Sequence, residues 1–366
     1  MGIHRGHKAR PLEWLAEKFI FLVSLSTILT VFLIFVFVAR EALPIFLGKE
    51  NSALIKPVIP PADMDKLKPE ELRAYLRLSE KQFQAMDRET KLDLMLVKQE
   101  AQDEIPERLR NDPDAKLNTT EWGAMLKPRQ WAGYDKPEYI WQPIGQVHKY
   151  NIIPLIVGSF KVTLIGLLFA VPLAVGAAIY ISQLARPRVR EVVKPVIEML
   201  SGIPSVVIGF FALLIMATVL QNVFGYETRL NAFVAGIALS FSVIPLVFSI
   251  SEDALTSVPR SYTQAALALG ASRWQTAWQI VMPAALPGVF AAVVLGFGRA
   301  IGETMIVLMV CSASVMSWSI FDSARSITTT IAAEMAEAVS GGHHYRILFM
   351  LGAILFAVTF ISNMIG

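Results

Sequence analysis

The stretch that decides the fold is residues 258–283, VPRSYTQAALALGASRWQTAWQIVMP. It lies between two long apolar segments, yet it carries polar side chains that a membrane span does not tolerate: Arg260, Gln264, Arg273 and Gln275. The pattern is helical from Tyr262 to Leu269. Gly270 is a natural helix stop, because a residue without Cβ adopts the left-handed conformation at little cost. Since Ser272 can cap a second short helix, the sequence predicts a helix–glycine turn–helix elbow between two membrane spans.

The composition is that of an integral membrane protein with a soluble part. Hydrophobic residues make up 54% of the 366 residues, charged residues make up 17%, and the mean hydropathy is +0.51. These values exclude an ordinary soluble domain. Charge is concentrated between Arg40 and Lys149, where 18 of the 33 basic and 19 of the 30 acidic residues lie. The single cysteine, Cys311, lies in an apolar run, so we expect it to face lipid or a helix and to form no intramolecular disulfide.

Six apolar runs are long enough to cross a hydrocarbon core. The predicted spans are residues 19–39, 151–182, 195–220, 230–250, 287–315 and 345–365. Basic residues precede the first span (Arg5, Lys8, Arg10 and Lys18), which places the N-terminus in the cytoplasm, and six spans return the C-terminus to the same side. We therefore expect a cytoplasmic N-terminus and first span in residues 1–39, an extracytoplasmic insert in 40–150, and a transmembrane domain in 151–366 that contains the elbow, 258–283.

The insert is predicted to be helical and solvated. Pro69 can open one helix, and a second is expected from Lys81 to Gln102, where acids and bases alternate. The aromatic residues between Asn118 and Gln146 either pack as a small cap on the membrane or sit at its interface. Beyond the fifth span, a further outer helix is expected over Ile327–Val339.

Three features are predicted inside the spans. Lys161 is expected to extend its ammonium outward to water. In the third span, Ser201, Ser205 and Gly209 are expected to share a face that permits close helix packing. Pro204 breaks the hydrogen-bond ladder there, which requires compensation by protein or by a cavity.

Arg299 and Glu303 lie deep in the predicted fifth span, four residues apart. At that spacing they can pair on one helix face, beside a close-packing face made by Gly298 and Gly302. Charges at this depth are costly and mark a pathway by default, whereas the alternative is a structural ion pair between helices. Glu198, nearer the cytoplasmic end, can equally be a residue at the membrane edge.

The elbow resembles the "EAA" loop of ABC-importer permeases, whose consensus reads Glu-Ala-Ala, three residues, Gly, nine residues, Ile-x-Leu-Pro. The chain matches it at Ala265, Ala266, Gly270, Ile280 and Pro283, and departs from it at Gln264 and Met282. The resemblance implies that Gln264, Ala265, Ala266 and Gly270 belong to a coupling helix that docks on a cytoplasmic ATPase. The alternative is an interfacial amphipathic helix without a partner.

Residues 139–366 and the first span also resemble permeases of the phosphate-specific transport (Pst) system. The specific pieces are EMLSGIPSVV (198–207), GRAIGETM (298–305) and TTTIAAEM (328–335), and the last two resemble the PstC partner rather than PstA. The resemblance implies that Arg299 and Glu303 act in phosphate passage. The implied partners are a PstA-like permease forming a heterodimer, two ATPase subunits, a periplasmic phosphate-binding protein, the phosphate ion and the lipid bilayer.

The expected fold is therefore all-α: a polytopic membrane protein with six transmembrane helices, a type I ABC-importer permease fold and a helical extracytoplasmic insert. Its expected place is the bacterial inner membrane, with both termini cytoplasmic. No Walker A sequence is present, so the chain is expected to be no enzyme and a partner must hydrolyse ATP. No cofactor, metal or nucleic acid is expected. Two alternatives remain open, a permease for another oxyanion and a membrane component of phosphate signalling.

Overall fold

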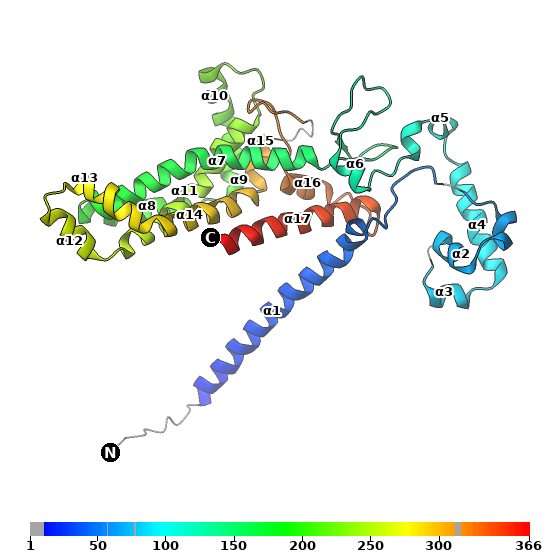
Figure 1. The fold of residues 1–366 in the computed structure, drawn as a ribbon, viewed down its shortest axis with the longest axis horizontal. Coiled ribbons are helices and arrows are strands. Elements are labelled where there is room, and N and C mark those ends of the chain that lie inside the picture. Colours follow the sequence, from blue (N-terminus) through cyan, green and yellow to red (C-terminus); the bar gives the residue numbers. More distant parts are fainter. Residues whose placement is uncertain (1–10, 57, 77, 312–315) are drawn as a thin grey trace.

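The computed structural model, which describes residues 11–56, 58–76, 78–311 and 316–366, is mostly helical (Figure 1). Within these residues, six helical segments are long and apolar enough to cross a membrane: Leu15–Phe46, Ile153–Leu184, Ser205–Phe224, Ala232–Ser257, Arg273–Ile301 and His343–Ile365. The predicted all-α, six-span fold is confirmed. Arg5, Lys8 and Arg10, on which the predicted orientation depends, lie outside the described residues.

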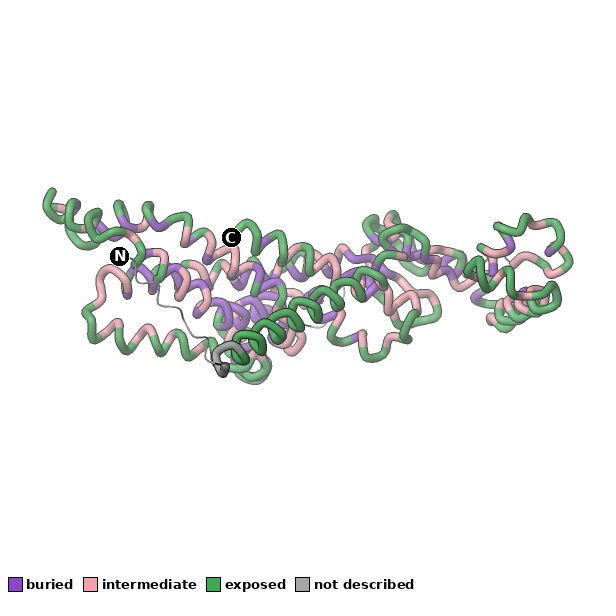
Figure 2. Tube along the Cα trace, turned by 90° about the horizontal axis from the view of Figure 1, so that it is seen from below, coloured by how far each residue is buried: buried purple, intermediate pink, exposed green. Residues whose placement is uncertain are grey.

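Three long helices form the centre of the bundle: α7 (Ile153–Ile179), α11 (Ala232–Ser257) and α14 (Met282–Ile301). Small residues let them approach closely. A Cβ on Gly236 of α11 would lie 2.4 Å from Cγ2 of Ile165 on α7, and a Cβ on Gly296 of α14 would lie 2.6 Å from Val247 Cγ2 on α11. The buried residues of the bundle gather here (Figure 2).

A second core lies at the insert end of the bundle. It joins the end of α1 (Pro11–Phe46) to α17 (His343–Ile365), with Ala42, Ile45 and Leu351 buried in it. Phe35 and Phe356 also meet, with ring centroids 5.6 Å apart. Toward its N-terminus α1 diverges from the bundle, and its most apolar window has no buried residue (Figures 1 and 2).

The third span begins later than predicted. Residues 187–200 form a separate helix, α8 (Pro187–Leu200), and the chain turns at 201–204 before α9 (Ser205–Phe211) and α10 (Ala217–Phe224), which are joined by a π-helical turn. The reason is Pro204, which occupies the position directly before α9. A proline has no N–H to donate, and at this position no helical hydrogen bond requires one. Ser201 therefore lies outside the span, and Glu198 is an exposed residue of α8. The expected close approach survives at Gly209, where a Cβ would lie 3.0 Å from Met309 Sδ.

The fifth span lies earlier than predicted. The elbow's second helix, α13 (Arg273–Thr276), continues through a π-helical turn directly into α14. The combined segment ends at Ile301. The apolar run after Ile301 forms a short separate helix, α15 (Met305–Val310), so the predicted span 287–315 is wrong at both ends, and residues 312–315 lie outside the described residues. Cys311 is buried against the bundle.

The insert has two parts. Its outer part holds α2 (Pro69–Leu76), α3 (Glu80–Ala85), α4 (Arg88–Asp103) and α5 (Glu107–Arg110), around a small core that includes Met64, Leu72 and Met95. The single helix predicted over Lys81–Gln102 is two helices, because the Asp87 side chain accepts the N–H of Thr90 at 3.0 Å and caps α4.

The inner part of the insert returns to the bundle through α6 (Trp122–Leu126) and the antiparallel pair β1 (Trp141–Gln142) and β2 (Lys149–Tyr150). Trp131 and Trp141 are buried, as expected of a packed aromatic cap. The outer helix α16 (Ile327–Glu334) ends five residues before the predicted Val339. Lys161 is half-buried, and its ammonium donates to the carbonyls of Ser317 and Ser319 in the segment between α15 and α16.

Candidate functional site

The first candidate site is the break between α14 and α15, where residues 302–304 are not helical. Arg299 lies in the last turn of α14, where the helix dipole favours a cation. Its Nη2 is 3.4 Å from Oγ of Ser242, a buried residue near the middle of the 26-residue α11. The break and the guanidinium therefore lie at mid-depth in the bundle.

The predicted pair of Arg299 and Glu303 is not formed. The helix ends at Ile301, so Glu303 does not follow Arg299 on the next helical turn. Its carboxylate instead accepts the N–H of Met305 at 3.2 Å, at the start of α15. Arg299 is exposed at the surface of this bundle and Glu303 is half-buried, so the guanidinium is open to a further partner.

Neighbouring helices support the broken backbone. The hydroxyl of Thr328 on α16 donates to the carbonyl oxygen of Glu303 at 3.0 Å. Irregular backbone at membrane depth is stable where protein covers it or where it lines a cavity. Gly298 packs against α17, with a Cβ position 2.8 Å from Asn363 Oδ1, whereas Gly302 meets only its own helix. The predicted two-glycine packing face therefore reduces to Gly298.

The second candidate site is the elbow, and its predicted local structure is confirmed. The helix α12 spans Arg260–Ala268, and Gly270 follows with φ of +89°. Ser272 and Gln275 form a reciprocal capping box at the start of α13. These caps fix the angle between α12 and the fifth span.

The elbow residues that resemble a docking motif differ in exposure. Gln264 and Ala265 are exposed, whereas Ala266 is only 8% exposed and faces this chain's own helices. Nothing lies within 4 Å of a Cβ on Gly270. The exposed surface of the elbow includes large apolar and aromatic side chains, at Tyr262, Leu269, Trp274 and Trp278, among polar and basic ones.

An ionic cluster beside the elbow was not predicted. Glu252 on α11 is fully buried, and its two carboxylate oxygens accept from Arg190 Nη2 at 2.5 Å and from Lys194 Nζ at 2.6 Å, both on α8. The hydrogen bond to Glu252 raises the pKa of Lys194. The sequence feature that could have indicated this cluster is the four-residue spacing of Arg190 and Lys194, which places both on one helix face. The cluster fastens α8 to α11 five residues before α11 ends.

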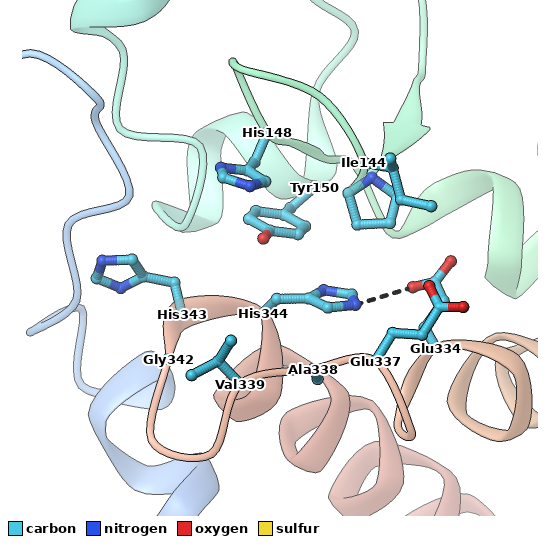
Figure 3. Close-up of a pocket in the computed structure, with 11 residues that line it drawn as sticks. Ile144, His148, Tyr150, Glu334, Glu337, Ala338, Val339, Gly342, His343 and His344 are labelled. Atoms are coloured by element: carbon cyan, nitrogen blue, oxygen red, sulfur yellow. Dashed lines mark ion pairs between the residues drawn. The ribbon is translucent and has the colours of Figure 1, made fainter. Parts of the chain in front are cut away.

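At the opposite end of the bundle, a buried carboxylate joins the insert to α16 and α17. Glu334 accepts the indole N–H of Trp141 at 3.1 Å and lies 2.8 Å from Arg325 Nη2. It also lies 3.3 Å from His344 Nε2 (Figure 3). Glu50 makes a parallel connection, to His343 at 2.6 Å and to Arg346. Among the described residues, no group of three or more His, Cys, Asp or Glu side chains is arranged to hold a metal ion.

Comparison with known proteins gives a family match, two sequence relatives and one similar solved structure. Residues 166–365 match the family described as binding-protein-dependent transport system inner membrane component. The probable ABC transporter permease protein YqgH of Bacillus subtilis is 38% identical over 222 residues, which cover 60% of this chain and 72% of YqgH. The phosphate transport system permease protein PstC of Pasteurella multocida is 34% identical over 239 residues, covering 60% of this chain and 73% of that protein.

A solved structure of the MetNI methionine ABC transporter in inward-facing conformations is also similar, with a TM-score of 0.42 and 18% identity. The match covers 59% of this chain and 94% of that chain.

Proposed function

Because this chain belongs to the family of binding-protein-dependent transport system inner membrane components, we propose that it is the PstC-type permease subunit of an ATP-driven importer of inorganic phosphate. The observation that supports phosphate as the cargo is Arg299, an exposed guanidinium at mid-depth beside a broken span. The name PstC of relatives at 34% identity or less agrees with it. A guanidinium binds oxyanions through two parallel hydrogen bonds.

The phosphate path is proposed to run past Arg299 and Glu303. In this single chain the Arg299 side chain is exposed and is not covered on its outward side. A second, PstA-like permease would cover it there and close the path. Phosphate would bind the Arg299 guanidinium, which pairs with no carboxylate among the described residues because Glu303 turns to the N–H of Met305. The carboxylate would limit retention, because a dianion close to Glu303 is repelled.

Coupling to a cytoplasmic ATPase is assigned to the elbow. Gln264 and Ala265 would contact the ATPase directly, and the exposed aromatic residues around them would enlarge the contact. Ala266 and Gly270 would act by holding the shape of the elbow, since one is buried and the other turns the chain with a positive φ. The chain lacks a Walker A sequence, so two partner ATPase subunits would supply ATP hydrolysis.

The protein is a multi-pass membrane protein whose described residues hold six candidate spans. We propose that its two termini lie on one side of the membrane. We propose that this side is the cytoplasm of a bacterium and that residues 1–39, 40–150 and 151–366 divide the chain as predicted. A periplasmic phosphate-binding protein would then deliver the anion on the side of the insert. The same guanidinium would accept another oxyanion, which makes sulfate the comparison cargo.

The test is uptake into proteoliposomes that contain this chain with its partner permease, the ATPase and the binding protein. ATP-dependent accumulation of phosphate, but not of sulfate, is expected. Arg299→Gln should lower phosphate uptake about tenfold or more, a loss of about 1.4 kcal/mol of interaction or more. Arg299→Lys should recover part of it, because an ammonium lacks the planar fork. Normal uptake by assembled Arg299→Gln complexes would refute the pathway role, and equal sulfate uptake would favour the wider oxyanion class.

A further inference from the structure

A pocket of about 300 Å³ opens where the insert meets the bundle (Figure 3). Its walls come from two loops that are far apart in the sequence, the β1–β2 connection around Ile144 and the α16–α17 turn around Val339. Glu334 and Glu337 lie on one side of it. The rings of His148, Tyr150 and His344 form another side.

The charge of this pocket suits a cation. Of the described residues that line it, two are carboxylates and none is lysine or arginine. Glu334 is balanced by Arg325, at 2.8 Å, while Glu337 is exposed and has no ion pair among the described residues. Burial, and next the neighbouring His343, lower the pKa of His148, so that ring adds no charge near neutral pH. His343 itself lies 2.6 Å from Glu50, which faces it from the end of α1.

The rings of His148, Tyr150 and His344, here called the ring wall, also favour a cation. His148 and Tyr150 are parallel with centroids 5.9 Å apart, and Tyr150 and His344 are nearly parallel with centroids 5.8 Å apart. Aromatic faces attract cations, and arginine stacks on such faces. A phosphate dianion would instead meet the exposed carboxylate of Glu337, so the pocket is unsuited to the proposed cargo.

The rim of the pocket is apolar and open. Ile144 is 72% exposed on one loop and Val339 is 79% exposed on the other. A small inorganic cation gains nothing from such a rim. The aliphatic stem of a lysine or arginine side chain does, because it packs on apolar surface while its head group remains charged.

We propose that this pocket receives a basic side chain of the extracytoplasmic binding protein and so docks that protein at the junction of insert and bundle. The inference rests on the proposed function for the identity of the partner. It deepens that function by naming the docking surface and its chemistry: a lysine or arginine head group against Glu337 and the ring wall, with its stem between Ile144 and Val339.

The test measures binding of the purified, phosphate-loaded binding protein to the complete importer in lipid nanodiscs. Glu337→Lys should weaken the Kd about tenfold or more, since like charges placed together at an interface repel strongly. Glu337→Gln should weaken it about threefold and reduce the salt dependence of binding, a readout that a purely structural role would not move. Glu227→Lys, a charge reversal at another exposed outer residue, is the matched control and should bind like wild type.

Wild-type affinity in Glu337→Lys would overturn the docking inference, and so would an equal loss in Glu227→Lys. Failure of the proposed function looks different, because the wild-type importer would then show no ATP hydrolysis stimulated by the phosphate-loaded protein. The basal ATPase rate, without binding protein, should be the same in all these variants, since Glu337 lies at the end of the bundle opposite the elbow.

Discussion

At the scale of single residues, the bundle depends on side chains that are small enough for helices to touch. Gly236 is the clearest case, because a Cβ there would lie 2.4 Å and 2.6 Å from two side-chain atoms of Ile165 close to its backbone. Those atoms are not the far end of a flexible chain, so α7 and α11 would have to separate. The contact of these two helices positions the core on which Ser242 and Arg299 rest.

We predict that Gly236→Ala lowers the free energy of unfolding by about 1–3 kcal/mol through overpacking. Gly176→Ala on α7 is the matched control, because a Cβ there meets nothing within 4 Å and it should cause no loss. Thermal unfolding of the two variants in the same detergent checks this. Equal melting temperatures would show that α7 and α11 can separate without cost.

At the scale of helices and turns, local signals in the sequence predicted structure correctly. Gly270 and Ser272 specify the elbow by their own backbone and side-chain geometry. The break after Ile301 was missed because apolar residues continue on both sides of it, so composition alone joins α14 to α15. For the same reason Arg299 and Glu303 were predicted with the right residue types but the wrong mutual geometry.

The helix α8 was partly absorbed into the third span for a related reason. Its apolar face and the span that follows form one hydrophobic stretch, and only the position of Pro204 separates them. Its link to Glu252 depends on residues about sixty positions apart. A repeating residue pattern within one helix cannot indicate a contact between residues that far apart.

The ionic cluster between α8 and α11 yields a prediction about coupling. Glu252→Gln should lower the free energy of unfolding by about 2 kcal/mol, the scale of a hydrogen bond to a charged group. It should also raise the ATP consumed per phosphate imported, because α11 leads directly into the elbow and α8 into the third span. Asp253→Asn is the control, since Asp253 is exposed and lies 3.7 Å from Lys194. Unchanged stoichiometry in a folded Glu252→Gln importer would contradict the coupling role.

A second prediction at this scale separates docking from folding on α12. Ala265→Glu should leave stability unchanged and weaken association of the ATPase, because Ala265 is exposed on the elbow. Ala266→Glu should instead destabilise the chain, since Ala266 is buried and an unpaired carboxylate there is costly. Co-purification with the ATPase, compared with thermal unfolding of the permease alone, distinguishes the two. Wild-type association by Ala265→Glu would remove this residue from the docking surface.

At the scale of the whole molecule, the outer part of the insert is a separable unit. It has its own small core, and its two ends meet, because the N–H of Ile55 donates to the carbonyl of Ala115 at 2.9 Å. The inner part instead belongs to the bundle through Trp141 and Glu50. The sequence predicted a soluble helical insert but not this division, which depends on contacts between distant segments.

We predict that residues 59–112 can be replaced by a short Gly/Ser linker without loss of membrane assembly or ATP-driven uptake. The hydrogen-bonded pair Ile55 and Ala115 would still close the gap. The measurement is uptake by the shortened importer at equal membrane level, with a Trp141→Ala variant in the inner part as the contrasting case. Abolished uptake in a fully assembled complex would assign the outer part a role in delivery of the cargo.

The packing of α1 against α17 has a consequence for how the protein is made. The ribosome releases α1 before α17, and α17, which packs on the C-terminal part of α1, is made about 300 residues later. At roughly 5–20 residues per second, α1 waits roughly 15–60 s in the bilayer for that neighbour. During that interval Glu50 has neither His343 nor Arg346 beside it. A nascent chain stalled before α17 would therefore present an unpaired helix and a carboxylate without its two partners on α17.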